Sequence, residues 1–148
     1  MRGSTHLLFG LILAALATKY YPFDRPLLAV ILMLTASVLP DIDERQSLLG
    51  RKVPVIGWFV RHRTFFHSIL LGVAITIVVA LFLGTAYGYA FGAAYLLHLL
   101  LDALTPTGVR PFWPSKLRIR GFVKVGGLLE KAIFIIAMII FVWVLLVP

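Results

Sequence analysis

The chain alternates long apolar runs with shorter polar stretches, and this pattern predicts about five helical segments. The apolar runs extend from about Thr5 to Tyr21, Pro26 to Pro40, His67 to Gly84, Tyr89 to Thr105 and Gly127 to Val147. YPFDRP separates the first two runs, TAYGY connects the third and fourth, and polar residues 41–66 and 106–125 fill the remaining gaps. Because the runs are long and do not alternate with a period of two, they indicate helices.

The composition changes this picture from a helical protein to a membrane protein. Of the 148 residues, 61% are hydrophobic and 14% are charged, whereas soluble domains average about 45–50% apolar and about 25% charged residues. We therefore predict an all-α, integral membrane helical bundle that forms a single domain over residues 1–148. The first two segments are short for a bilayer, which needs about 20 residues per helix. We expect them to form a hairpin whose polar ends reach one face.

The basic residues fix the expected orientation of the bundle. If Met1 lies on one side, that side collects 12 Lys and Arg residues and the other side collects Lys19 and Arg25. The larger group contains Arg2, Arg45, Arg51, Lys52, Arg61, Arg63, Arg110, Lys116, Arg118, Arg120, Lys124 and Lys131. The positive-inside rule makes this side cytoplasmic. Topology and anionic membrane lipids thus account for the net charge of +8, and no nucleic acid partner is expected.

Seven polar residues at helix ends share the face that this topology makes cytoplasmic. They open the first segment, close the second in LPDID, precede the third in HRTFFHS and close the fourth, and they are His6, Asp41, Asp43, His62, His67, His98 and Asp102. His98 and Asp102 are four residues apart, so one helix face presents both, about 6 Å apart along the axis. Imidazole and carboxylate together suit a divalent metal. All four histidines of the chain belong to this group, and the convergence predicts a metal site.

Each pattern taken alone also has a structural interpretation. His98 and Asp102 can form a hydrogen bond inside the bundle, although ionisable groups in membrane helices are functional by default. Asp41 and Asp43 can mark an interfacial helix end, and HRTFFHS can be a solvated basic turn. Gly88 and Gly92 favour close packing of two helices, and Glu130 is a favourable charge at a helix start.

The ordered motifs resemble those of a known family. TH, LPDID, SLLGRK, HRTFFHS and HLLLDALTPTG follow one another, and this order resembles the YdjM-like family of inner-membrane-bound metal-dependent hydrolases. The likeness covers roughly residues 4–115. That family is distantly similar to the zinc-dependent phospholipase C and single-strand nuclease group, whose helical enzymes bind several zinc ions through His and Asp. A second HxxxD or HxxxE pair of those soluble enzymes is missing here.

The resemblance implies metal ligands and an activity. Carried over by motif, the implied ligands are His6, Asp41, His62, His67, His98 and Asp102, with Asp43 as a further one. The implied cofactor is one or more divalent ions, with zinc preferred over manganese, iron or nickel. Water activated by the metal is expected to attack a phosphoester or ester of a membrane lipid or other amphiphile. Asp43 or Asp41 can accept the proton. Arg63 can bind a phosphate, or serve only as a positive-inside arginine.

Two other functions fit the same residues. A metal or solute transporter would use the ligands as a transit site, but it should also carry polar residues near the middle of the membrane, where Thr76 is one of few. A non-catalytic membrane regulator would use a structural metal to join its short helices. Such a site is closed by its ligands, and seven available ligands favour the enzyme.

Overall fold

A computed structural model describes residues 1–44, 47, 50 and 63–147 of the chain. The described residues form five α-helices and no strands. The helices are α1 (Gly3–Tyr20), α2 (Pro26–Val38), α4 (Ile69–Leu83), α5 (Thr85–Ala103) and α6 (Leu128–Leu146). Two short 3-10 helices, η1 (Leu39–Asp43) and η2 (Phe65–His67), complete the described elements. The all-helical bundle predicted from the apolar runs is confirmed.

The helix boundaries follow local signals with one correction. Pro26 begins α2, where a missing N–H costs nothing, and the Ser68 hydroxyl accepts a hydrogen bond from Leu71 N at the start of α4. The prediction that TAYGY is a connection is wrong, because those residues form the first turns of α5. Gly84 alone joins α4 to α5. Its φ of +104° suits glycine, and this sharp turn lets α5 begin at once.

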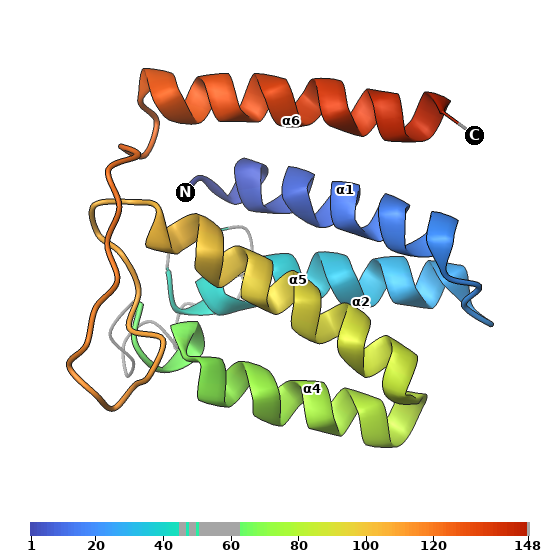
Figure 1. Ribbon diagram of the computed structural model, residues 1–148. Helices are drawn as coiled ribbons and strands as arrows, with labels where there is room; N and C mark the ends of the chain where they lie inside the picture. Colours follow the sequence, from blue (N-terminus) through green and yellow to red (C-terminus); the bar gives the residue numbers. More distant parts are fainter. Residues whose placement is uncertain (45–46, 48–49, 51–62, 148) are drawn as a thin grey trace.

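The five helices run roughly alongside one another (Figure 1). The core lies between α1, α2, α4 and α5 and includes Met33, Ala36, Phe91, Ala94 and Tyr95. Helix α6 lies at one edge of the bundle and packs chiefly against α1. Two segments are long and apolar enough to cross a membrane, Pro26–Asp43 and Leu128–Leu146.

Small residues allow α4 and α5 to approach closely. A Cβ at Gly88 would lie 2.6 Å from Ala80 Cβ and 3.0 Å from the Thr76 carbonyl oxygen. A Cβ at Gly92 would lie 2.8 Å from the Thr76 hydroxyl. The close packing predicted from the GxxxG pattern is therefore confirmed.

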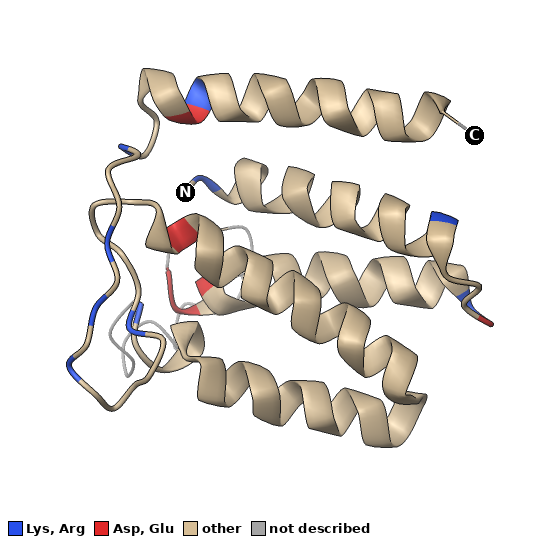
Figure 2. Cartoon of the chain, viewed as in Figure 1, with Lys and Arg blue, Asp and Glu red and all other residues tan. Residues whose placement is uncertain are grey.

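One end of the bundle gathers the polar loops. The start of α1, the end of α2 with η1, the start of α4, the end of α5 and the start of α6 all lie there (Figure 1). The described Lys and Arg residues concentrate at this end (Figure 2). The other end holds the end of α1 and the start of α2 (Figure 1), where Lys19, Asp24 and Arg25 occur in the sequence. The segment after α5 folds back over this end, because Val123 N donates to Leu104 O at 2.9 Å and Ile69 N donates to Pro111 O at 2.8 Å.

Candidate metal centre

Four side chains from three separate parts of the chain meet at the polar end of the bundle. Asp41 comes from η1, His67 from η2, and His98 and Asp102 from the last two turns of α5. One ligand atom of each lies within 4.8 Å of the others. His67, His98 and Asp102 are fully buried, whereas the Asp41 side chain is 13% exposed. Asp41 therefore forms the side of the cluster that solvent reaches.

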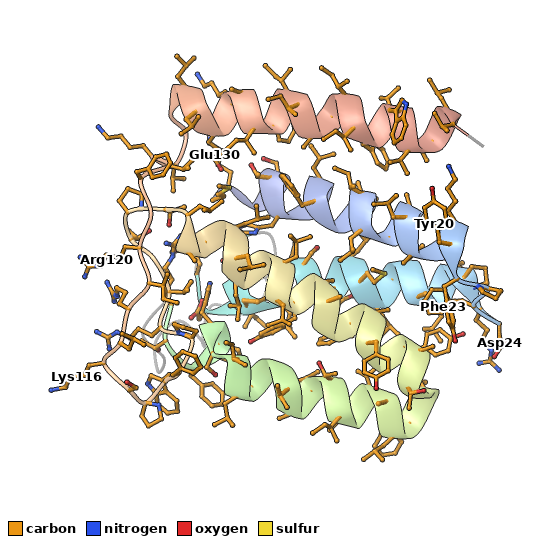
Figure 3. The ribbon with its side chains drawn as sticks, viewed as in Figure 1. Tyr20, Phe23, Asp24, Lys116, Arg120 and Glu130 are labelled. Atoms are coloured by element: carbon orange, nitrogen blue, oxygen red, sulfur yellow. The ribbon has the colours of Figure 1, made fainter. Side chains whose placement is uncertain are left out.

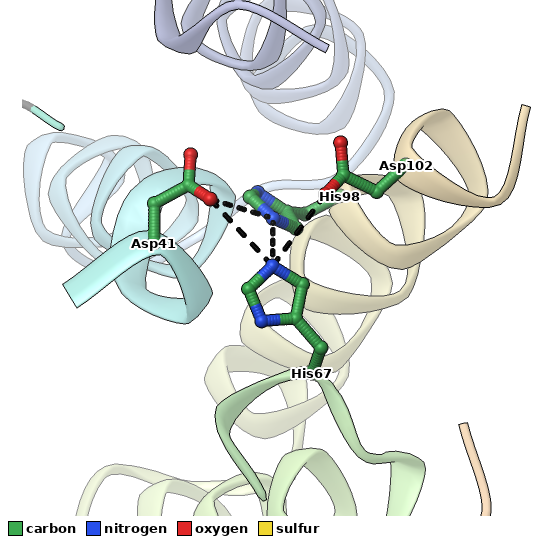
Figure 4. Close-up of side chains that lie close together, drawn as sticks. All are labelled: Asp41, His67, His98 and Asp102. Carbon is green, nitrogen blue, oxygen red and sulfur yellow. Dashed lines mark hydrogen bonds and ion pairs between the residues drawn. The ribbon is translucent and has the colours of Figure 1, made fainter. Parts of the chain in front are cut away.

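Four of the six separations between these atoms are close to those around a tetrahedral metal (Figure 4). His67 Nε2 lies 3.4 Å from His98 Nε2, 3.5 Å from Asp102 Oδ2 and 3.6 Å from Asp41 Oδ1. Asp41 Oδ1 lies 3.7 Å from His98 Nε2. Zinc binds His nitrogen and carboxylate oxygen at about 2.0–2.2 Å, so the edges of a zinc tetrahedron measure about 3.3–3.6 Å. The chemistry and spacing of the donors therefore fit one divalent ion.

A hydrogen bond orients the His98 imidazole, and a carboxylate lies near the second nitrogen of His67. His98 Nδ1 lies 2.8 Å from the Ser37 carbonyl oxygen, to which it donates. That hydrogen bond leaves the proton on Nδ1 and the lone pair on Nε2, which is the atom in the cluster. His67 Nδ1 lies 3.8 Å from Asp43 Oδ2, which is an ion-pair contact beyond hydrogen-bond distance. Asp43 also accepts a hydrogen bond from Arg63 N at 3.2 Å.

Asp102 is the most heavily contacted member of the cluster. Its Oδ2 lies 3.0 Å from the Arg63 guanidinium, and its Oδ1 lies 3.1 Å from His6 Nε2. The Met1 backbone nitrogen also contacts Oδ1. The His6 ring stacks on the His98 ring, with centroids 3.9 Å apart. A carboxylate with 0% side-chain exposure is thus balanced by several donors, as burial of its charge requires.

Arg63 connects the cluster to the segment after α5. Besides Asp102, its guanidinium donates to Thr105 Oγ1 at 2.9 Å, to the Gly108 carbonyl oxygen at 3.3 Å and to the Thr107 hydroxyl. The guanidinium side chain is 12% exposed. In this arrangement Arg63 holds the TPTG turn, residues 105–108, against the cluster.

His67 is the cluster histidine that lies outside the long helices, and its environment favours the charged form. Complete burial opposes protonation, but contacts with the carboxylates of Asp102 and Asp41 and the charge of Asp43 outweigh it and raise the pKa above its usual value. The surrounding carboxylates thus favour a proton on His67. A bound divalent ion would replace this proton, since histidine binds metal in its neutral form.

The structure brings together four of the seven residues predicted as ligands and places two more beside them. His6 contacts the second oxygen of Asp102, and Asp43 faces the second nitrogen of His67. His62 lies outside the described residues. Neither His6 nor Asp43 belongs to the group of four ligand atoms.

One positioning residue was not predicted. The Tyr95 hydroxyl donates to the Phe66 carbonyl oxygen at 2.5 Å and lies 3.4 Å from the Ser68 carbonyl oxygen. These contacts fasten η2, and hence His67, to α5. A tyrosine three residues before His98, on the same helix face, is the sequence signal that could have found it.

Comparison with known proteins identifies the family. The family model described as YdjM inner membrane protein matches residues 1–147. The chain belongs to the YdjM inner membrane protein family. It is therefore an integral membrane protein, as the hydrophobic composition predicted.

Named relatives support the same assignment. The chain is 32% identical over 142 residues to the uncharacterized protein YvsG of Bacillus subtilis, with 90% of this chain and 87% of YvsG covered. It is 34% identical over 126 residues to the inner membrane protein YdjM of Escherichia coli, and the same values hold for YdjM of Shigella flexneri. That alignment covers 75% of this chain and 62% of the Escherichia coli protein. No solved structure matches the chain.

Proposed function

We propose that this chain is a membrane-embedded metal-dependent hydrolase that cleaves a phosphoester or ester of a lipid or amphiphile at the cytoplasmic interface. The observation that carries the proposal is the set of four ligand atoms, of which four pairs lie 3.4–3.7 Å apart, the spacing of donors around one metal ion. Zinc is the preferred ion, with manganese, iron or nickel as alternatives. When bound, such an ion acidifies water and polarises a phosphoryl or acyl oxygen.

The residues around the ligands divide into orienting and accessible groups. The Ser37 carbonyl oxygen fixes the His98 imidazole, Asp43 lies 3.8 Å from His67 Nδ1, and Arg63 and His6 fix Asp102. Asp43 is engaged with His67 and Arg63 N, which favours an orienting role for it over that of a general base. Asp41 is the partly exposed member, so it is the carboxylate best placed to accept a proton from water.

The position of the site favours an amphiphilic substrate. The cluster lies at the end of apolar helices and beside the basic loops (Figure 2). Exposed cations such as Lys116 and Arg120 lie on the segment that folds over this end (Figure 3). Basic residues near a membrane surface attract anionic headgroups. A phospholipid headgroup would reach the cluster without leaving the membrane plane.

The test pairs metal loading with a lipid hydrolysis assay. Protein purified in detergent and loaded with zinc is offered phosphatidic acid, phosphatidylglycerol and an acyl ester of p-nitrophenol, and product release is measured. We expect turnover of at least one substrate class, lost at least hundredfold in His98→Ala and in chelator-treated protein. Asp24→Asn, at the opposite end of the bundle, is the matched control and should keep full turnover. Zinc-loaded protein that binds metal but cleaves no lipid or ester would refute the enzyme.

A structural metal is the second candidate, and one observation favours it. Four protein donors are enough to close a tetrahedral zinc site, and a closed site leaves no position for water. The two candidates differ in what metal removal does. A structural metal would be required for folding and show no turnover, whereas the hydrolase loses turnover when the metal is removed.

A transporter is disfavoured by where the polar groups lie. The acidic, basic and histidine residues of the five described helices are His6, Lys19, His98, Asp102, Glu130 and Lys131, and all lie within the first or last two turns of their helices. Helices α2 and α4 carry none. A conduction path should have ionisable groups near the middle of the membrane.

A further inference from the structure

A second polar site lies between the starts of α1 and α6, apart from the metal cluster. A cavity of about 290 Å³ opens there, lined at its polar end by Arg2, Ser4 and Lys131 and at its apolar end by Phe134 and Ile135. Glu130, at the start of α6 (Figure 3), also lines it. The cavity therefore offers cations at the membrane surface and apolar side chains about one turn further along α6.

The acidic residue in this cavity is satisfied by donors other than the two cations. Glu130 is 2% exposed, and its carboxylate accepts hydrogen bonds from Arg2 N at 2.6 Å, from the Thr5 hydroxyl at 3.1 Å and from Gly126 N. These donors fasten the first turn of α6 to the first turn of α1. These three hydrogen bonds stabilise the charge of Glu130 without an ion pair to a cationic side chain of the described residues.

Both cations consequently face the cavity without an acidic partner. Within the described part of the chain, neither the Arg2 guanidinium nor the Lys131 ammonium forms an ion pair. The guanidinium lies against Gly126, where a Cβ would come within 2.8 Å of Arg2 Nη2. Gly126 has a φ of +73°, so this position suits glycine in backbone and in side-chain space. The turn thus leaves room for the guanidinium at the mouth of the cavity.

We propose that this cavity binds one anionic phospholipid. The phosphate would lie between Arg2 and Lys131, with the Ser4 hydroxyl as a further donor, and an acyl chain would lie along Phe134 and Ile135. Basic pockets between membrane helices at the cytoplasmic side suit acidic headgroups, and the N-termini of α1 and α6 add positive potential. Since α6 packs chiefly against α1, the lipid would hold α6 to the bundle. The proposal does not depend on the hydrolase reaction.

The experiment measures lipid binding by native mass spectrometry and by lipid-dependent thermal stability in a neutral detergent. The probes are phosphatidylglycerol, phosphatidylcholine and inorganic phosphate. The test variant is Arg2→Gln with Lys131→Gln. The control, Lys116→Gln with Arg120→Gln, removes the same charges from exposed residues of the basic loop. Circular dichroism and gel filtration check that the variants fold, and the single variant Lys131→Gln carries the test if the double variant does not fold.

We expect the wild type to bind one phosphatidylglycerol and to prefer it at least tenfold over phosphatidylcholine. The test variant should lose at least tenfold in affinity for phosphatidylglycerol and most of the lipid-dependent rise in melting temperature. The single variant Lys131→Gln should lose at least threefold in this affinity, and the control variant should lose less than threefold. Equal losses in test and control variants would show unspecific charge attraction and overturn the site. Equal affinity for both lipids, or full competition by inorganic phosphate, would also overturn it.

Discussion

The metal cluster predicts that two neighbouring aspartates, Asp102 and Asp43, contribute differently to metal affinity. Asp102 belongs to the group of four, with its Oδ2 3.5 Å from His67 Nε2, whereas Asp43 lies outside the group, 3.8 Å from His67 Nδ1. Asp102→Asn and Asp43→Asn both replace a carboxylate by an amide of the same shape. The two variants therefore compare a ligand with an orienting residue at nearly constant volume.

The expected magnitudes follow from these positions. Losing one partner of a buried, charge-balanced group costs about 3–5 kcal/mol, which corresponds to about 10²–10⁴ in affinity. Both aspartate side chains have 0% exposure, but Asp102 is the one in the ligand group and faces Arg63, His6 and His67, so the larger cost applies to it. Removing an outer residue that orients a ligand costs about 10- to 100-fold in metal affinity. The Asp43→Asn variant should therefore bind metal at least about ten times more tightly than the Asp102→Asn variant.

The assay is competition for zinc against a chromophoric chelator, in detergent and at fixed pH and salt. Asp24→Asn removes the same charge from an exposed site at the far end of the bundle (Figure 3) and should leave the affinity unchanged. Gel filtration confirms that each variant stays folded. The reasoning is refuted if Asp43→Asn binds zinc as weakly as Asp102→Asn, or if Asp102→Asn matches the wild type.

Three further predictions concern the surroundings of the cluster. Tyr95→Phe loses the hydrogen bonds that fasten η2. It should therefore lower the free energy of unfolding by about 1 kcal/mol and weaken zinc binding in the same competition assay. The control Tyr20→Phe, at a side chain that is 75% exposed, should change neither quantity. Gly88→Ala places a methyl group against the backbone of α4 and should destabilise the bundle by about 1–3 kcal/mol in thermal unfolding, more than Gly92→Ala, which meets only the Thr76 side chain; the opposite order would contradict the packing. Chelator treatment of zinc-loaded protein should lower its melting temperature, because a ligand at a thousand times its Kd stabilises the folded protein by about 4 kcal/mol. An unchanged melting temperature would argue against a bound ion.

The helical bundle could be predicted because its determinants are local. Apolar runs of helical length and the break at YPFDRP are visible in the chain, and so is the gathering of Lys and Arg at one end. The start of α5 was placed too late because Gly88 and the polar-looking TAYGY resemble a turn. The close approach to α4 was predicted from Gly88 and Gly92 and is confirmed, but the sequence did not show that the helix carrying them already begins at Thr85.

The residues of the candidate site could be predicted from the sequence, but the division into metal ligands and residues that only support them could not. Helical spacing placed His98 and Asp102 on one face, and shared topology placed Asp41 and His67 beside them. Whether a residue contributes a ligand atom or contacts a neighbouring ligand depends on differences of about 1 Å in distance, and the sequence does not encode these directly. The backbone carbonyl of Ser37, which fixes His98, has no signal in its residue type. Tyr95 was missed because a buried tyrosine in an apolar helix is ordinary until its hydroxyl partner is known.

Elemental analysis of detergent-purified protein after zinc loading tests the central claim most directly. The wild type, His98→Ala and the control Asp24→Asn are measured together, and X-ray absorption of the zinc-loaded wild type reports the ligands. We predict about one zinc per chain in the wild type and the control, bound by nitrogen and oxygen at about 2.0–2.2 Å, and little in His98→Ala. A wild type that retains no metal, or a His98→Ala variant that retains as much as the wild type, would contradict the metal centre.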